Sequence, residues 1–218
     1  MAHIHLQDGA FSLPLMLLWW GVALGILAVC ILRLRRGSGM ASRDLTTAAL
    51  LTATAFAIFQ VSLPLFGGIH MSMTPLIGIL AGPWTGSLVV FLVNILSAAI
   101  GHGGYGMAGA NTLVSVGEVT VGFLVWRALR GSGASPGLRA GTAALLALAA
   151  GTVLMVGIIL LSGIQGVTQS AGRLLAGLTL LAGINMAAAV GEAAVTALVV
   201  STLARVRPDL LGEGRNAR

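Results

Sequence analysis

Two histidines stand close to the start of the chain, at a spacing that suits a small chelate. The sequence begins Met-Ala-His-Ile-His, which places His3 and His5 beside an amino-terminal amine. A terminal amine, the next backbone nitrogens and an imidazole can close small rings around one ion. A near-planar set of nitrogen donors suits Ni(II) or Cu(II) and, less distinctively, Co(II). These residues predict a site for a divalent metal ion at the amino terminus.

The register of this chelate depends on whether the initiator methionine is removed. Without Met1, the amine of Ala2 and the amide and imidazole nitrogens of His3 fill three corners of a square, and His5 or His70 supplies the fourth. With Met1 retained, the amine, two amides and the imidazole of His3 fill all four corners. Both forms require a deprotonated amide. The alternative interpretation is a polar tip without ligands.

The remaining two histidines lie in glycine-rich segments. His70 follows the Gly-Gly pair at 67–68, and His102 lies in the glycine-rich segment 101–106. Histidine is the commonest metal ligand, and glycine allows the backbone to approach a ligand closely. We expect His70 to bind the metal and His102 to lie beside the site or on its access path. Simple packing and a plain tight loop are the alternatives.

Two carboxylates fall within apolar runs. Ionisable side chains inside a membrane are costly, so Glu118 and Glu192 are functional candidates by default. The alternative is a structural role, with the carboxylates paired to polar side chains of neighbouring helices, namely Asn94, Asn111 and Asn185.

The composition is that of an integral membrane protein. Apolar residues make up 57% of the 218 residues, charged residues only 8%, and the mean hydropathy is +0.99. A soluble domain carries about 25% charged residues. The length allows six or seven helical spans of roughly 20 residues each. The single cysteine, Cys30, excludes an intrachain disulfide, and the sequence contains neither a Walker A motif nor an H-E-x-x-H motif.

Seven apolar runs are candidates for membrane spans. The run at 73–82 is too short to cross a bilayer alone, so it must begin near Leu65 or form a broken helix inside the bundle. Pro75 and the Gly-Pro pair at 82–83 are residues that start or break helices, and they lie at the two ends of this run. The other runs are longer and lie near 12–34, 45–63, 84–100, 108–129, 140–163 and 173–204.

The arginines favour seven helices over six. Segments 33–43, 127–139 and 205–218 carry four, three and four arginines. Basic residues concentrate on the cytoplasmic side, and seven helices with the amino terminus outside place all three segments there. We therefore predict an all-α integral membrane protein with an extracytoplasmic metal-binding segment (1–11), a transmembrane bundle (12–204) and a basic cytoplasmic tail (205–218). All four histidines then fall on the outer face.

Three motifs resemble the CbiM/NikM family, the substrate-capture membrane components of energy-coupling factor transporters for cobalt and nickel. The first is Ala-His-Ile at 2–4, followed by Asp-Gly at 8–9. The second is His70 followed by Gly-Pro at 82–83. The third is Gly-His-Gly-Gly at 101–104, leading to Gly-Ala-Asn at 109–111. The motifs cover residues 1–112, and the rest of the chain is similar only in hydropathy.

The resemblance implies a ligand set. The terminal amine of Ala2, the amide and imidazole of His3 and the imidazole of His70 would hold the metal. Two extra residues separate Ile4 from the Asp-Gly pair, so alignment from that pair selects His5 instead. His102 stands where the family has aspartate. It would lie with Asn111 beside the site or on the access path.

The resemblance also implies partners and a role. A capture component is not an enzyme, and it would work with a transmembrane coupling (T) protein, ATP-binding cassette ATPases and a small accessory membrane subunit. Its substrate would be Co(2+) or Ni(2+), taken up across a bacterial or archaeal inner membrane. The rival interpretations are a self-contained secondary metal/proton transporter that uses Glu118 and Glu192, and an energy-coupling factor component for an organic vitamin.

Overall fold

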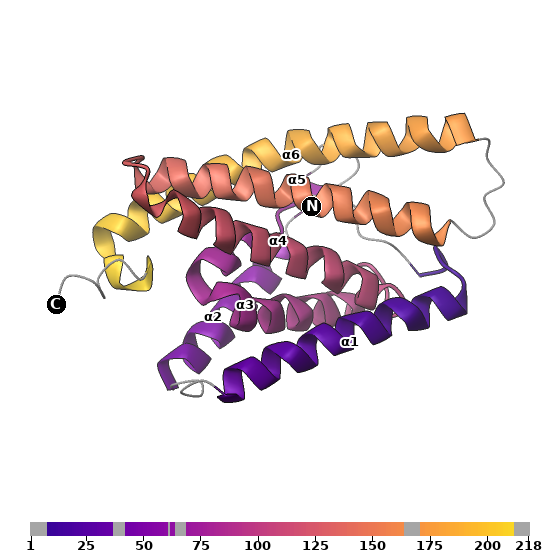
Figure 1. The fold of residues 1–218 in the computed structure, drawn as a ribbon, viewed down its shortest axis with the longest axis horizontal. Coiled ribbons are helices and arrows are strands. Elements are labelled where there is room, and N and C mark those ends of the chain that lie inside the picture. Colours follow the sequence, from indigo (N-terminus) through magenta and orange to yellow (C-terminus); the bar gives the residue numbers. More distant parts are fainter. Residues whose placement is uncertain (1–7, 37–41, 61, 64–68, 164–170, 212–218) are drawn as a thin grey trace.

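The prediction of an all-helical membrane protein is confirmed. A computed structural model describes residues 8–36, 42–60, 62–63, 69–163 and 171–211. The long helices are α1 (Leu13–Arg36), α2 (Ser42–Phe59), α3 (Thr74–Ala99), α4 (Ala108–Ala128), α5 (Pro136–Ser162) and α6 (Ala171–Val206). Two short 3-10 helices, η1 (Leu129–Gly131) and η2 (Pro208–Leu211), and two short strands, β1 (Ser62–Leu63) and β2 (Ile69–His70), complete the described part (Figure 1).

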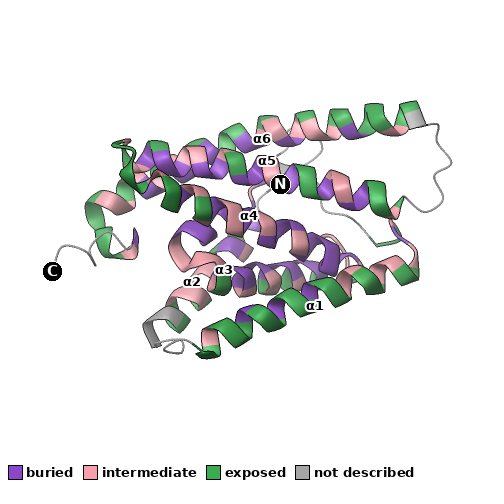
Figure 2. Cartoon of the chain, viewed as in Figure 1, coloured by how far each residue is buried: buried purple, intermediate pink, exposed green. Residues whose placement is uncertain are grey.

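The helices are long and apolar enough for a membrane. Five of the described helices could cross a bilayer by length and composition, and the segment Leu45–Phe59 of α2 is a shorter apolar helix. Helix α1 is largely uncovered by the rest of the chain, whereas α3 and α4 form the buried centre (Figure 2). A helix with apolar residues on its uncovered face suits contact with lipid. The chain is therefore a multi-pass membrane protein.

Helix α3 reverses direction in the middle. Gly82 has φ 72° and ψ 177°, which is not helical, and Pro83 follows it. A straight helix of this length would separate its ends by about 39 Å. Instead, the His70 and His102 rings on either side of α3 lie 5.1 Å apart between centroids. Residues 74–81 and 83–99 are thus two antiparallel helical segments, and the predicted broken helix is confirmed.

The first helical segment of α3 is packed deep in the bundle. Gly78 allows it to approach α4 closely, because a Cβ there would overlap the carbonyl oxygen of Val119. Leu76 and Ile79 of the same segment pack in one apolar cluster with Trp126 at the end of α4. The segment therefore runs from the middle of α4 towards the end of the molecule where α4 ends.

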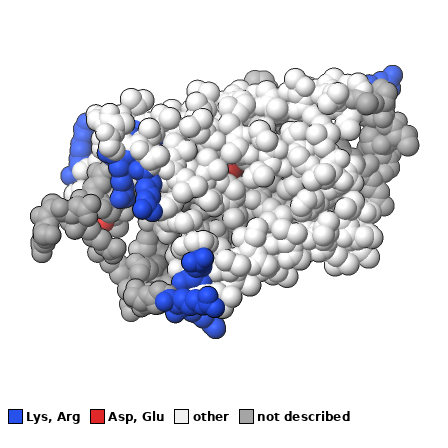
Figure 3. Space-filling view, in the orientation of Figure 1, with Lys and Arg blue, Asp and Glu red and all other residues white. Residues whose placement is uncertain are grey.

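The described arginines gather at that same end. They lie in the last turns of α1, α4 and α6 and in the first turn of α5. The ends of α4, α5 and α6 lie together, and the end of α1 lies apart from them, towards the same end of the molecule (Figure 1). In the space-filling view basic groups cluster at one end of the molecule, with one at the other (Figure 3). Arg173, near the start of α6, belongs to the opposite end. The seven-span count and the orientation stay predictions.

Candidate metal-binding site

The His70 imidazole lies in a shaped turn between α2 and α3. Strand β2, which contains His70, pairs antiparallel with β1, and Ser62 is the partner of His70 in this ladder. The imidazole stacks on the ring of Phe59, the last residue of α2, with 5.5 Å between centroids. His70 is only 9% exposed. The ring is thus held between the end of α2 and the start of α3.

The hydrogen bonding of His70 leaves one ring nitrogen available. Burial lowers the pKa of His70, a hydrogen bond to the Phe59 backbone raises it, and the nearby His102 lowers it again. Nδ1 is buried and has no hydrogen-bond partner among the described residues. Buried polar atoms are normally paired, so this ring nitrogen is one that could bind a ligand.

A buried carboxylate anchors the backbone just after His70. Glu192 of α6 accepts hydrogen bonds from the Ser72 backbone N–H at 3.0 Å, from the Met73 N–H at 2.8 Å and from the Ser72 hydroxyl at 3.0 Å. Met73 has φ 56°, a left-handed conformation that is uncommon outside glycine. Glu192 thus stabilises a strained turn at the N-terminus of α3.

Glu118 holds the next residue of the same turn. Thr74 Oγ1 donates to Glu118 Oε2 at 2.6 Å, and Gly151 of α5 leaves the space that this carboxylate fills. Both carboxylates are buried. These hydrogen bonds come from Ser72, Met73 and Thr74 at the start of a neighbouring helix, which agrees with a structural role for the carboxylates. The sequence did not identify these three residues as the partners.

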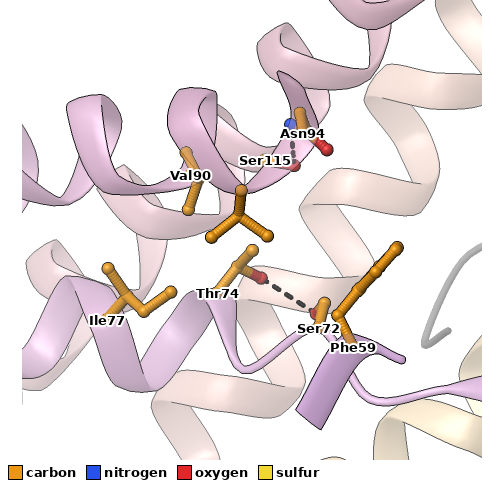
Figure 4. Close-up of a pocket in the computed structure, with 8 residues that line it drawn as sticks. Phe59, Ser72, Thr74, Ile77, Val90, Asn94 and Ser115 are labelled. Atoms are coloured by element: carbon orange, nitrogen blue, oxygen red, sulfur yellow. Dashed lines mark hydrogen bonds between the residues drawn. The ribbon is translucent and has the colours of Figure 1, made fainter. Parts of the chain in front are cut away.

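A small cavity with a mostly apolar lining lies next to the turn. Figure 4 shows Thr74 and Ile77 on the first segment of α3, facing Val90 on the second. Ser72 and Thr74 form one hydroxyl pair at 3.2 Å, and Asn94 donates to Ser115 of α4 at 3.3 Å (Figure 4). The lining consists of Phe59, Ser72, Thr74, Ile77, Val90, Val93, Asn94 and Ser115. Phe59 is the residue that the cavity lining shares with the stack on His70.

The structure brings His102 to His70. The two imidazoles are 5.1 Å apart between centroids and nearly perpendicular, at 81°. The His102 ring also meets Phe59 edge-on at 6.1 Å. Asn111, the other residue expected beside the site, is buried in the first turn of α4. Its backbone carbonyl accepts a hydrogen bond from the Ser115 hydroxyl at 3.1 Å.

The start of the described chain is fastened to the loop that contains His102. The Gly106 N–H donates to Asp8 Oδ1 at 2.8 Å, and a Cβ at Gly104 would overlap the Asp8 carboxyl group. Phe11 is 1% exposed and belongs to a cluster with Met107 at the start of α4. The first and third motifs are therefore in contact, and nothing in the sequence alone indicated this contact.

The expected amino-terminal ligands Ala2, His3 and His5 lie outside the described residues. Within the described ranges no group of three or more His, Cys, Asp or Glu side chains could hold a metal ion. Among the described residues, His70 and His102 are the two histidines whose rings lie close together.

The comparison with known proteins decides the family. Residues 5–210 match the family model CbiM, the cobalt uptake substrate-specific transmembrane region. The chain belongs to the CbiM family. The resemblance found in the sequence is therefore confirmed. This family comprises transport components and not enzymes.

A curated relative agrees with membership of the CbiM family. A protein of Archaeoglobus fulgidus that carries the name fused nickel transport protein NikMN is 30% identical over 131 residues, which are 58% of this chain. The match covers 42% of the relative, so this CbiM protein corresponds to about two fifths of its length.

Solved structures agree on the fold. A transition metal transporter is 20% identical, with a TM-score of 0.80 over 99% of this chain and all of that one. A truncated transition metal transporter has a TM-score of 0.78 at 20% identity, over 93% of this chain and 99% of that one. The S component of a bacterial energy-coupling factor transporter has a TM-score of 0.50 at 18% identity, over 78% of this chain and 97% of that one. The CbiM protein thus has the S-component fold.

Proposed function

We propose that this chain is the metal-capturing component of an ATP-driven energy-coupling factor importer for Co(II) or Ni(II). The observation that carries the proposal is the meeting of His70, His102 and the anchored Asp8 at one place in a CbiM-family fold. Imidazole nitrogens are good ligands for both metals, and the choice between them depends on geometry and availability.

The proposed topology has seven passes, with the amino terminus outside and the carboxyl terminus in the cytoplasm. In this scheme the helical segment 74–81 forms a short third pass with His70 at its outer end, and residues 83–99 form the fourth. The reversal of α3 at Gly82 supports the additional pass. The one-sided arginines support the orientation, because they mark the cytoplasmic side of a cell membrane.

The proposed metal site combines the amino terminus with His70. The anchor at Asp8 limits where the ligands can reach, since the six residues from Asp8 back to Ala2 span at most about 22 Å when extended. Within that reach the terminal amine of Ala2 and the amide and imidazole of His3 complete a nitrogen set with His70. His5 is the alternative imidazole, and the register depends on removal of Met1.

The proposed partners supply the energy. The chain has no Walker A motif, so ATP hydrolysis by that route requires other subunits. A transmembrane coupling protein, ATP-binding cassette ATPases and a small accessory membrane subunit would complete the importer. Here Glu118 and Glu192 stabilise the turn after His70, which favours a structural role over that of carriers in a self-contained metal/proton transporter.

Metal binding by the purified chain tests the capture role. We expect one Ni(II) or Co(II) ion per chain, loss of binding in the double variant His3→Ala, His70→Ala, and strongly weakened binding when a residue is added before Ala2. Intact-mass analysis of the amino terminus settles the register. Stoichiometric binding by the double variant would refute the site.

A transport assay separates the capture component from a complete transporter. Liposomes that contain this chain alone should accumulate no metal, and liposomes with the coupling protein and ATPases should accumulate it only with ATP. Ion flux through the chain alone would overturn the proposal in favour of a secondary transporter.

A further inference from the structure

We propose that His102 is a second imidazole ligand of the transported ion, beside His70. The inference rests on the proposed function, because it assigns a further donor to the same site. The family resemblance implies the imidazoles of His3 and His70, and His102 stands where the family has aspartate. The assignment therefore follows from the geometry of this chain.

The separation of the two rings fits ligands of one ion. A metal–nitrogen bond of about 2.0–2.1 Å and a ring radius of roughly 1.1 Å place each ring centre about 3.2 Å from the ion. Two such rings at an angle of about 90–110° at the metal are about 4.5–5.2 Å apart, by the same geometry. The measured separation of His70 and His102 is 5.1 Å. The rings are thus spaced as adjacent ligands.

The hydrogen bonding of the two rings points to a shared ligand. Nδ1 of His70 and Nδ1 of His102 are both buried, and neither has a hydrogen-bond partner among the described residues. Buried polar atoms are normally paired, so such atoms need an explanation. Two of them on rings in contact are explained together by one ion that both nitrogens bind.

The backbone holds His102 in place for this role. The His102 N–H donates to the Ser97 carbonyl at the end of α3 at 2.9 Å. Gly101 and Gly103 on either side have φ values of 87° and 88°, which other residues rarely adopt. The ring is further fixed by its edge-on contact with Phe59. A ligand held on a rigid loop loses little freedom when the metal binds.

A second imidazole changes the chemistry of the site. It raises the number of neutral nitrogen donors and adds no charge, which favours Ni(II), Co(II) and Cu(II) over Mg(II) and Ca(II). It also leaves two ligands on the bundle when the amino-terminal segment is absent. A chain that lacks residues 2–5 should thus retain weak metal binding through His70 and His102.

The experiment counts imidazoles on the bound metal in the purified full-length protein. Cu(II) serves as the probe for pulsed EPR, and Ni(II) affinity is measured by competition with a chelator. His102→Phe keeps the packing of the ring on Phe59 but removes both nitrogens, and His102→Asn gives a second, polar variant. The matched control in the same loop is Tyr105→Phe, since this side chain is exposed.

We expect the His102 variants to lose one imidazole signal and to bind Ni(II) about 10–100-fold more weakly, the range seen when groups that support a metal site are removed. Tyr105→Phe should match the wild type. An unchanged imidazole count and affinity in both His102 variants, with binding lost in His70→Ala, would overturn this inference alone. A wild-type chain that binds no metal would overturn the proposed function as well.

Discussion

The Glu192 carboxylate accepts a hydrogen bond of 2.8 Å from the backbone N–H of Met73, a residue 119 positions earlier in the chain. This contact joins the middle of α6 to the turn between β2 and α3. Met73 is the only non-glycine residue with positive φ in the described part of the chain. A negative charge at a helix N-terminus is favourable, and here it also stabilises a strained conformation three residues after His70.

Glu192→Gln should loosen this turn. The amide keeps one acceptor oxygen but loses the charge and the second acceptor. Some of the hydrogen-bond donors of Ser72 and Met73 are therefore left unpaired. We expect a loss of about 1–3 kcal/mol in stability, the cost of unpaired buried donors. Metal affinity should fall about 10-fold, because the supporting contacts of a ligand histidine matter for binding. Thermal unfolding in detergent and Ni(II) competition measure the two effects.

The matched control is Thr196→Val, one turn further along α6. Thr196 is fully buried, and its hydroxyl has no hydrogen-bond partner among the described residues. Removal of an unpaired buried hydroxyl should be neutral or stabilising. Equal stability and affinity in Glu192→Gln and the wild type would contradict the anchoring role.

Gly78→Ala should destabilise the bundle. The added methyl group meets the Val119 backbone carbonyl, which cannot move aside as a side chain could. Overpacking of this kind costs about 1–3 kcal/mol. Gly183→Ala in α6 is the control, because a Cβ there meets nothing within 4 Å and alanine favours a helix. A melting temperature of Gly78→Ala at or above that of Gly183→Ala would refute the close packing of α3 on α4.

Asp8→Ala should release the amino-terminal segment from the bundle. The Gly106 N–H loses its acceptor, and the start of the described chain loses its hydrogen bond to the loop that contains His102. We expect about 10-fold weaker Ni(II) binding, as for other supporting groups, with little change in the melting temperature. Asp8→Asn retains an acceptor oxygen, so its Ni(II) affinity should lie between that of the wild type and that of Asp8→Ala.

The control for this change is Asp209→Asn, at the other end of the molecule. Asp209 is paired with the exposed Arg207 at 2.9 Å. Surface ion pairs contribute little to stability. The metal affinity of Asp209→Asn should equal that of the wild type. A loss of affinity as large as that of Asp8→Ala would point to a general effect of charge.

The sequence predicts the helices and the metal chemistry better than the contacts. Apolar runs and arginines locate the spans, because lipid imposes the same requirement on each helix separately. The break at Gly82 is also visible, since a Gly-Pro pair interrupts a helix wherever it falls. The contact of His70 with His102 and the bonds from Glu192 and Glu118 join residues far apart in the chain. They depend on how the helices pack, which no local pattern encodes.

Cysteine labelling tests the seven-pass topology. Cys30 is the only cysteine, and it is buried, so Cys30→Ala gives a cysteine-free background. Tyr105→Cys and Ser132→Cys then place single exposed thiols at opposite ends of α4. If the arginine-rich end is cytoplasmic, a membrane-impermeant maleimide added to intact cells should label position 105 and not position 132, which reacts only after the cells are opened. The reverse pattern would mean that the bundle is inverted, and the histidine pair would then face the cytoplasm, where it could not capture metal from outside.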